Sequence, residues 1–322
     1  MFDKENAVKI MNEFGKQKLP FLFIINFDFK KSIVLPANEI DESKIKYSFR
    51  SEIPGKDKKL NNTIGFNVVP PSFDEFKKAF DIVQNEIKAG NTYLLNLTFS
   101  SKIIGNFDLY DIYKYANAPY KLYLKDKFTV FSPETFIKIT DKKIFSYPMK
   151  GTIDADITNA ENRILNDKKE TAEHYTIVDL IRNDLNQVAK KVKVERFRYI
   201  DKIRTNYKNL LQVSSEISGK LPVNYNEQIG TILSKLLPAG SISGSPKKKT
   251  LEIIKAAETH KRNYYTGIAG FFDGKNLDSF VMIRFVEKNG NKFFFKSGGG
   301  ITNLSNAQSE YDELCDKIYI PI

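Results

Sequence analysis

The stretch SFVMIRFVEKNGNKFFFKSGGG, Ser279 to Gly300, contains the pattern that indicates the fold class. Apolar and aromatic residues alternate with polar ones over much of it, as expected where successive side chains line the two faces of a β-strand. Further runs of this kind predict strands and hairpins at 21–29, 92–103, 120–132, 135–148, 209–218 and 265–273. Strands are therefore expected from near the start of the chain to near its end.

Amphipathic segments that predict helices alternate with these runs. In residues 72–91, Ser72 is a candidate N-cap, Gly90 is a candidate end, and apolar side chains recur on one helical face: Phe73, Phe76, Phe80, Val83 and Ile87. Residues 167–192 and 246–262 are similar, and Pro246 suits a first helical position. No repeat and no Gly/Ser/Pro-rich linker divides the sequence. We therefore expect one large α+β domain over residues 1–322, with the N-terminal residues 1–70 as its least informative region.

The composition argues against several classes of protein. The chain has 50 lysines and arginines and a net charge of +11, but these residues are scattered among Asp and Glu, which favours a solvated basic surface over a nucleic-acid interface. The N-terminus lacks a secretory pattern and no apolar run could span a bilayer, so we expect a cytoplasmic protein without a membrane partner. With one cysteine and two histidines, any metal should be bound by carboxylates.

Two pairs of glutamates have a spacing that could serve a shared cation. Glu170 and Glu173 lie three residues apart in one predicted helix, and Glu310 and Glu313 repeat this spacing near the C-terminus. A hard ion such as Mg²⁺ takes carboxylate and water oxygens, so one glutamate from each helix would suffice. The same spacing is common on exposed helix faces, and both interpretations stand at this point.

Two glycine-containing segments could hold an anion. Residues 298–300 close a predicted strand and residues 240–244 precede a predicted helix, where backbone N–H groups can bind a carboxylate; tight turns would also explain both. Neither segment matches the P-loop or the dinucleotide fingerprint. Arg284 lies among the apolar residues of a predicted strand, FVMIRF, and its guanidinium could bind a carboxylate in bidentate fashion.

A series of segments, in this order, resembles the successive motifs of the chorismate-binding enzymes: GNTYLLNLTF, SPETF, YPMKGTID, KKETAEHYTIVDLIRNDL, LLQVSSEISGKL, LPAGSISGSPK, RNYYTGIAGF, SFVMIRF and KSGGGITNLSNAQSEYDELCDK. The resemblance covers residues 89–317. That family includes anthranilate synthase component I, aminodeoxychorismate synthase component I, isochorismate synthase and salicylate synthase. The resemblance implies a single layered domain of twisted, mainly antiparallel sheets flanked by helices, as in anthranilate synthase component I, with chorismate and Mg²⁺ in a central cleft.

The resemblance also implies roles for individual residues. Glu173 and Glu313 match the family's magnesium ligands, and Glu170 and Glu310 match carboxylates beside them. Glu134, in SPETF, matches the general acid that protonates the departing 4-hydroxyl. Other matched residues are expected to hold the carboxylates of chorismate: Tyr265, Arg284, Gly298, Gly300 and Lys317. The rest are expected to contact the ring or its substituents: Gly151, Thr152, Gln212, Ser241 and Ser243. Gln212 stands where the family usually has a histidine.

Two positions distinguish the family's reactions. Water-using members typically have a basic lysine at the position of Leu94, and leucine cannot abstract a proton. Anthranilate synthases usually have alanine at the position of Lys150, whereas aminodeoxychorismate synthases have lysine. The resemblance therefore predicts aminodeoxychorismate synthase component I, acting in 4-aminobenzoate and folate synthesis. Anthranilate synthase component I, an isochorismate or salicylate synthase, and a degenerate chorismate-binding protein without activity are the alternatives.

The reaction gives Lys150 a specific role. Replacing the C4 hydroxyl of chorismate by an amine with retained stereochemistry can proceed through two allylic displacements, and we predict that Lys150 is the first, covalent nucleophile. A lysine with its ordinary pKa of about 10.4 is mostly protonated at pH 7, so its surroundings must favour the neutral amine. The only cysteine, Cys315, lies in the predicted C-terminal helix and offers no amidotransferase nucleophile. Ammonia is therefore expected from a glutamine amidotransferase partner or from solution.

Overall fold

The computed structural model describes residues 1–49, 65–204 and 209–321. The chain divides into two compact units, each assembled from three segments. Unit 1 comprises residues 1–39, 134–243 and 266–281, and unit 2 comprises residues 40–133, 244–265 and 282–322. One domain over residues 1–322 stays a prediction. Within the N-terminal region 1–70, residues 50–64 lie outside the described residues.

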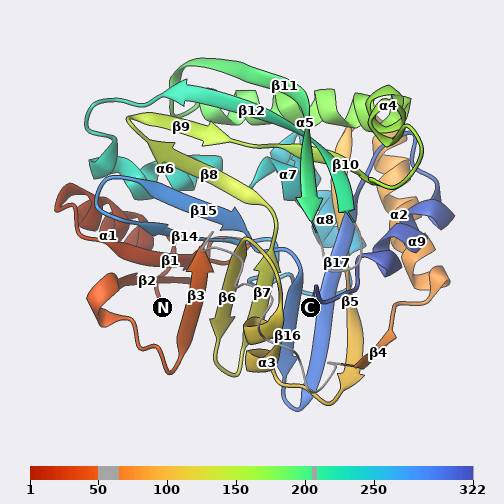
Figure 1. The fold of residues 1–322 in the computed structure, drawn as a ribbon, viewed down its shortest axis with the longest axis horizontal. Helices are drawn as coiled ribbons and strands as arrows, with labels where there is room; N and C mark the ends of the chain where they lie inside the picture. Colours follow the sequence, from red (N-terminus) through yellow and green to blue (C-terminus); the bar gives the residue numbers. More distant parts are fainter. Residues whose placement is uncertain (50–64, 205–208, 322) are drawn as a thin grey trace. The chain divides into compact units, whose positions relative to one another are not determined.

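Unit 1 is built on a sheet that has nine strands within the described residues, in the order β10-β12-β9-β8-β15-β14-β1-β2, with β11 paired to β12 (Figure 1). Its strands are β1 (Phe21–Ile25), β2 (Ser32–Pro36), β8 (Thr135–Thr140), β9 (Lys143–Ser146), β10 (Met149–Asp154), β11 (Lys190–Arg204), β12 (Asn209–Lys220), β14 (Ile268–Phe272) and β15 (Leu277–Val281). The pairings between these strands are antiparallel. All five residues of β1 are buried, so the N-terminal segment contributes to the core of this unit.

The helices of unit 1 are α1 (Lys4–Lys16), η1 (Ala37–Glu39), α4 (Ala160–Asn166), α5 (Lys168–Asn186), η2 (Tyr225–Gln228), α6 (Ile229–Leu236) and α7 (Gly240–Ser243). Helix α5 packs against β10, β11 and β12, which brings its glutamates to that end of the sheet (Figure 1). Helix α1 packs on α6, and a Cβ atom at Gly230 would lie 2.4 Å from the carbonyl oxygen of Val8. Glycine at position 230 therefore allows the two helices to approach closely.

Unit 2 is built on a sheet that has eight strands within the described residues, in the order β13-β5-β17-β16-β7-β6-β3, with β4 paired to β5. Its strands are β3 (Ile45–Phe49), β4 (Phe66–Val69), β5 (Leu94–Gly105), β6 (Tyr120–Leu124), β7 (Phe128–Ser132), β13 (Gly244–Ser245), β16 (Phe285–Asn289) and β17 (Lys292–Ile301). These pairings are also antiparallel.

The helices of unit 2 are α2 (Phe73–Lys88), α3 (Leu109–Tyr115), α8 (Lys247–Ala257) and α9 (Ala307–Asp316). The predicted helix at 72–91 is confirmed as α2, and Ser72 and Glu75 form a reciprocal capping box at its start. Helix α2 packs against β5, β17, α8 and α9 (Figure 1). A separate apolar cluster lies between α3, the sheet and the C-terminal residues, and it includes Ile112, Phe131, Phe295 and Ile318.

Several predicted element boundaries were wrong. The helix expected over 167–192 ends at Asn186, and β11 begins at Lys190, where lysine and valine alternate. The helix expected over 246–262 ends at Ala257, and Pro246 is its N-cap residue rather than its first helical residue. Residues 240–243, expected to precede a helix, form the short helix α7 themselves.

One site segment also differs from the prediction. Arg284 does not lie inside a strand: it adopts a left-handed φ of 53° between β15 and β16. The glycines at 298–300 are followed by one further strand residue, Ile301, so they lie just before the end of β17. A Cβ at Gly298 would lie 2.5 Å from the carbonyl oxygen of Leu97 on β5, so this close strand approach requires glycine. In the described residues of the chain, no helix is long and apolar enough to cross a membrane.

Candidate functional site

Lys150 lies at a bulge in β10. The pairing register with β12 shifts between Met149 and Thr152, and Gly151 has a left-handed φ of 81°. The predicted run 135–148 stops before Lys150, whereas strand β10 includes Lys150 and continues to Asp154. Bulges of this kind change the direction in which a strand presents its side chains.

The bulge places Lys150 beside the glutamates of α5. Its Nζ donates to Oε2 of Glu173 at 2.9 Å, and the Glu173 side chain is only 7% exposed. A Cβ at Gly151 would lie 3.2 Å from Oε2 of Glu170, so this second glutamate also borders the bulge. The structure thus brings Lys150 together with the glutamate pair of α5, which was predicted separately from it. Nucleophilic attack by this amine would require the ion pair with Glu173 to open.

His174 follows Glu173 in α5 and was not predicted as a site residue. Its side chain is 1% exposed, and its Nε2 lies 2.7 Å from Oγ of Ser215, which accepts the backbone N–H of Arg198 at 2.9 Å. Burial lowers the pKa of His174 to about 4, with smaller contributions from the charges of Arg198 and Lys150. Among the described residues, its Nδ1 is buried without a hydrogen-bond partner. His174 is therefore neutral near pH 7 and links α5 to β12.

The other predicted residues of unit 1 fall into two groups. Thr152 on β10 lies directly opposite Gln212 on β12, so these two are neighbours in the sheet. The hydroxyl of Ser241 donates to Oε1 of Glu134 at 2.6 Å, which joins the predicted general acid to α7. Ser243 is fully buried, and its hydroxyl donates to the carbonyl of the preceding turn at 2.8 Å.

In unit 2, Lys317 joins the glycine run to the second glutamate pair. Its Nζ lies 2.6 Å from Oε1 of Glu313 and donates to the carbonyl oxygen of Gly298 at 3.1 Å. Glu310 is 5% exposed, and a Cβ at Gly299 would lie 3.7 Å from both Oε2 of Glu310 and Nζ of Lys317. Helix α9 and β17 thus place two carboxylates, one ammonium and the glycine backbone in one neighbourhood.

Tyr265 and Arg284 are also predicted site residues of unit 2. Tyr265 is 3% exposed, and its ring packs on Phe285 with a centroid separation of 5.8 Å. The guanidinium of Arg284 lies 5.3 Å from the ring centroid of Tyr319, a contact that the sequence did not indicate. Within the described residues, Nε of Arg284 is buried without a hydrogen-bond partner. A guanidinium with an unsatisfied N–H is suited to an anionic ligand.

The predicted magnesium ligands are divided between the units. Glu170 and Glu173 belong to unit 1, and Glu310 and Glu313 belong to unit 2. Across the residues that the structure describes, no group of three or more His, Cys, Asp or Glu side chains is arranged to hold a metal. Carboxylates are the ligand type that Mg²⁺ prefers, and each unit offers one pair of them. Magnesium binding stays a prediction.

Comparison with known proteins identifies the family. The family model described as chorismate binding enzyme matches residues 22–322. The chain is 50% identical to an uncharacterized PabA-like protein of Haemophilus influenzae, covering 99% of this chain and 97% of that protein. It is 31% identical to aminodeoxychorismate synthase component 1 of Bacillus subtilis, covering 80% of this chain and 57% of that protein. It is also 31% identical to anthranilate synthase component 1 of Aquifex aeolicus, covering 80% and 56%. The chain belongs to the chorismate-binding enzymes and spans little more than half the length of these two synthases.

Solved structures confirm the predicted fold class. The chain resembles MenF, the menaquinone-specific isochorismate synthase of Escherichia coli, with a TM-score of 0.74 and 16% identity over 98% of this chain and 81% of that one. It resembles anthranilate synthase component I of Streptococcus pneumoniae with a TM-score of 0.70 and 19% identity over 95% and 84%. The α+β fold of antiparallel sheets flanked by helices is therefore that of anthranilate synthase component I.

Proposed function

We propose that the chain is an aminodeoxychorismate synthase component I that converts chorismate and ammonia to 4-amino-4-deoxychorismate. The observation that carries the proposal is the position of Lys150: it lies on a strand bulge with its amine 2.9 Å from a buried carboxylate of α5. Sequence identity does not separate this activity from anthranilate synthase, because both relatives are 31% identical to the chain. Lys150 is the residue that favours amination at C4, and Leu94 argues against the water-using members of the family.

In the proposed reaction the neutral amine of Lys150 forms a bond to C2 of chorismate. The ring double bonds shift, the C4–oxygen bond breaks, and Glu134 protonates the departing hydroxyl so that it leaves as water. Oε1 of Glu134 accepts the Ser241 hydroxyl, which would hold the carboxyl group of this acid in place. Ammonia then bonds to C4, the double bonds shift back, and the C2–nitrogen bond to Lys150 breaks, which regenerates the free lysine.

Other residues would bind and orient the substrate. Lys317 and Arg284 would supply positive charge for its carboxylates. The Nε of Arg284, which is buried and has no hydrogen-bond partner within the described part of the chain, supports this role. Mg²⁺, for which Glu173 and Glu313 remain the predicted ligands, would neutralise carboxylate charge. The ammonia would come from a glutamine amidotransferase partner, for which a high ammonium concentration can substitute in the assay.

The proposal is tested by incubating the chain with chorismate, Mg²⁺ and ammonium and identifying the product by mass and absorbance. We expect 4-amino-4-deoxychorismate from the wild type, and none from Lys150→Ala although chorismate still binds. Lys143→Ala is the matched control, because Lys143 is an exposed lysine on β9 of the same sheet. Wild-type turnover by Lys150→Ala would disprove the covalent role of Lys150.

Anthranilate synthase is the second candidate, and the equal sequence identities are the observation that supports it. The same incubation decides between the two, since anthranilate would be released as an aromatic, fluorescent product together with pyruvate. Formation of isochorismate would instead place the chain among the water-using members of the family.

A further inference from the structure

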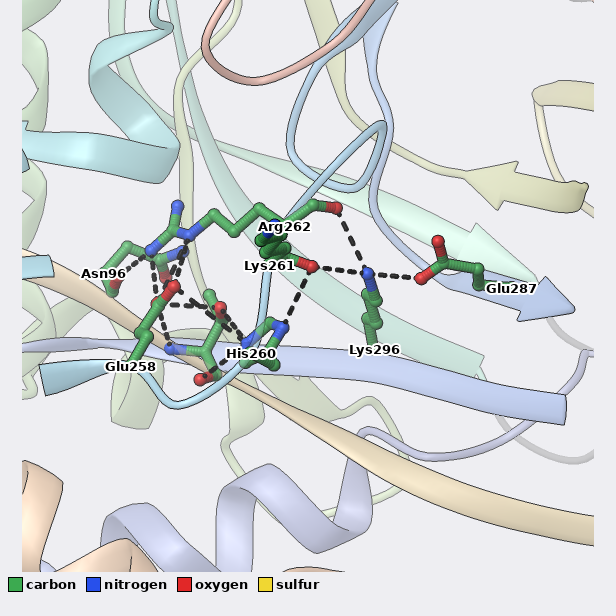
Figure 2. Close-up of polar contacts among 8 residues, drawn as sticks. Asn96, Glu258, His260, Lys261, Arg262, Glu287 and Lys296 are labelled. Carbon is green, nitrogen blue, oxygen red and sulfur yellow. Dashed lines mark hydrogen bonds and ion pairs between the residues drawn. The ribbon is translucent and has the colours of Figure 1, made fainter. Parts of the chain in front are cut away.

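Glu258 and Arg262 form a buried ion pair in unit 2, just beyond the end of α8 (Figure 2). Both side chains are 3% exposed, and the guanidinium donates to the two carboxylate oxygens at 2.7 and 2.9 Å. Removing two charges from water is costly, and such pairs are often no more stabilising than apolar residues of similar volume. Stability alone is therefore a weak reason for this pair.

The ion pair holds two residues of β5. Nη2 of Arg262 donates to the carbonyl oxygen of Asn96 at 2.6 Å (Figure 2). Oε1 of Glu258 accepts the backbone N–H of Thr98 at 2.9 Å and its hydroxyl at 2.8 Å. The backbone of β5 is thus held at Asn96 by the Arg262 guanidinium and, two residues later, at Thr98 by the Glu258 carboxylate.

These two residues lie opposite the glycines of the candidate site. In the register of β5 and β17, Asn96 pairs with Gly300 and Thr98 pairs with Gly298. Glycines have no side chain to pack and so depend on their partner strand for a defined backbone position. The ion pair therefore fixes the strand that aligns the glycine backbone.

Arg262 also holds the turn that carries Tyr265. The N–H of Tyr265 donates to the carbonyl oxygen of Arg262 at 3.0 Å. The ammonium of Lys296, which is 3% exposed, donates to the same carbonyl at 3.2 Å and to that of Lys261 at 2.8 Å, and it is paired with Glu287 (Figure 2). Lys296 lies on β17, so the turn and the glycine strand share one hydrogen-bonded network.

We infer that Arg262 is a positioning residue for the carboxylate-binding region of the site. Through Glu258 it fixes the strand opposite Gly298 and Gly300, and through its carbonyl it fixes Tyr265. This inference rests on the proposed function, which assigns these glycines and this tyrosine to the carboxylates of chorismate. Arg262 itself does not need to touch the substrate.

Calorimetric titration of the full chain with chorismate in the presence of Mg²⁺ tests the inference, because it measures Kd and stoichiometry separately. Arg262→Lys keeps a positive charge but cannot reach Asn96 and both oxygens of Glu258 together, and should raise Kd about tenfold. Thr98→Val, a milder change, removes one hydroxyl donor and should raise Kd about threefold. Lys138→Met is the control: it breaks a part-buried ion pair of 3.2 Å with Asp278 in unit 1 and should leave Kd unchanged.

A purely structural role predicts a different result. Variants that only fold less well would bind fewer equivalents of chorismate with the wild-type Kd, and that result in Arg262→Lys and Thr98→Val would overturn the inference. Failure of the wild type to bind chorismate would overturn both the inference and the proposed function. If the wild type binds chorismate but releases another product, the proposed function is wrong, and weaker binding by both variants still supports the positioning role.

Discussion

Lowering the pH from 7 to 5 should destabilise the folded chain by about 2 kcal/mol through His174 alone. Burial lowers the pKa of this imidazole from 6.5 to about 4, so between these values the unfolded chain binds a proton that the folded chain does not. The contribution of His174 to stability is complete above pH 6.5 and is lost as the pH falls toward 4. The gap between the two pKa values limits the loss to about 3 kcal/mol.

Nuclear magnetic resonance of the untagged, metal-free chain tests this directly, because the sequence contains only His174 and His260. Burial also lowers the pKa of His260, so neither imidazole should titrate at its ordinary pKa. His174→Gln and His260→Gln assign the two resonances. Urea unfolding is then measured at pH 7 and at pH 5. Between these values the free energy of unfolding should fall by about 2 kcal/mol less in His174→Gln than in the wild type. A His174 resonance that titrates at 6.5 or above would refute the reasoning. So would an equal fall in the free energy of unfolding in the wild type and in His174→Gln.

Two predictions concern the stability of single elements. Ser72→Ala removes the hydroxyl that caps α2 and should lower the free energy of unfolding by about 1 kcal/mol in a denaturant titration; an unchanged midpoint would show that the capping box contributes nothing. Gly230→Ala places a methyl group against the backbone of Val8 and should cost about 1–3 kcal/mol by separating α1 from α6, measured by the same titration. Equal or higher stability of that variant would contradict the close approach of the two helices.

The most accurate predictions from the sequence concern features that depend on residues close together in the chain. Helix α2 was predicted with its cap because the apolar period and the cap residue Ser72 lie within one short segment. The glutamate spacing in α5 and α9 was found for the same reason, since residues three apart share one helix face. The α+β class followed from the alternation of predicted strands and helices, whereas the antiparallel sheets of both units were implied only by the family resemblance.

Structural features that depend on residues far apart in the sequence could not be predicted from local patterns. The bulge at Lys150 exists only in the pairing of β10 with β12, and the buried position of His174 depends on Ser215, 41 residues away. Arg284 was assigned to a strand because its neighbours are apolar, yet the chain passes from unit 1 to unit 2 directly before Met282 and Arg284 takes a left-handed conformation there. Periodicity carries no information about such a break.

The covalent role of Lys150 is the central claim, and one measurement tests it most directly. The wild-type chain is incubated with chorismate and Mg²⁺ without ammonia, quenched with acid and digested, and the peptide containing Lys150 is analysed by mass spectrometry. The account predicts that this peptide gains the mass of chorismate less one water, and that adding ammonium before the quench removes the adduct as 4-amino-4-deoxychorismate forms. Formation of that product with no adduct on Lys150, or with the adduct on a different lysine, would contradict the account.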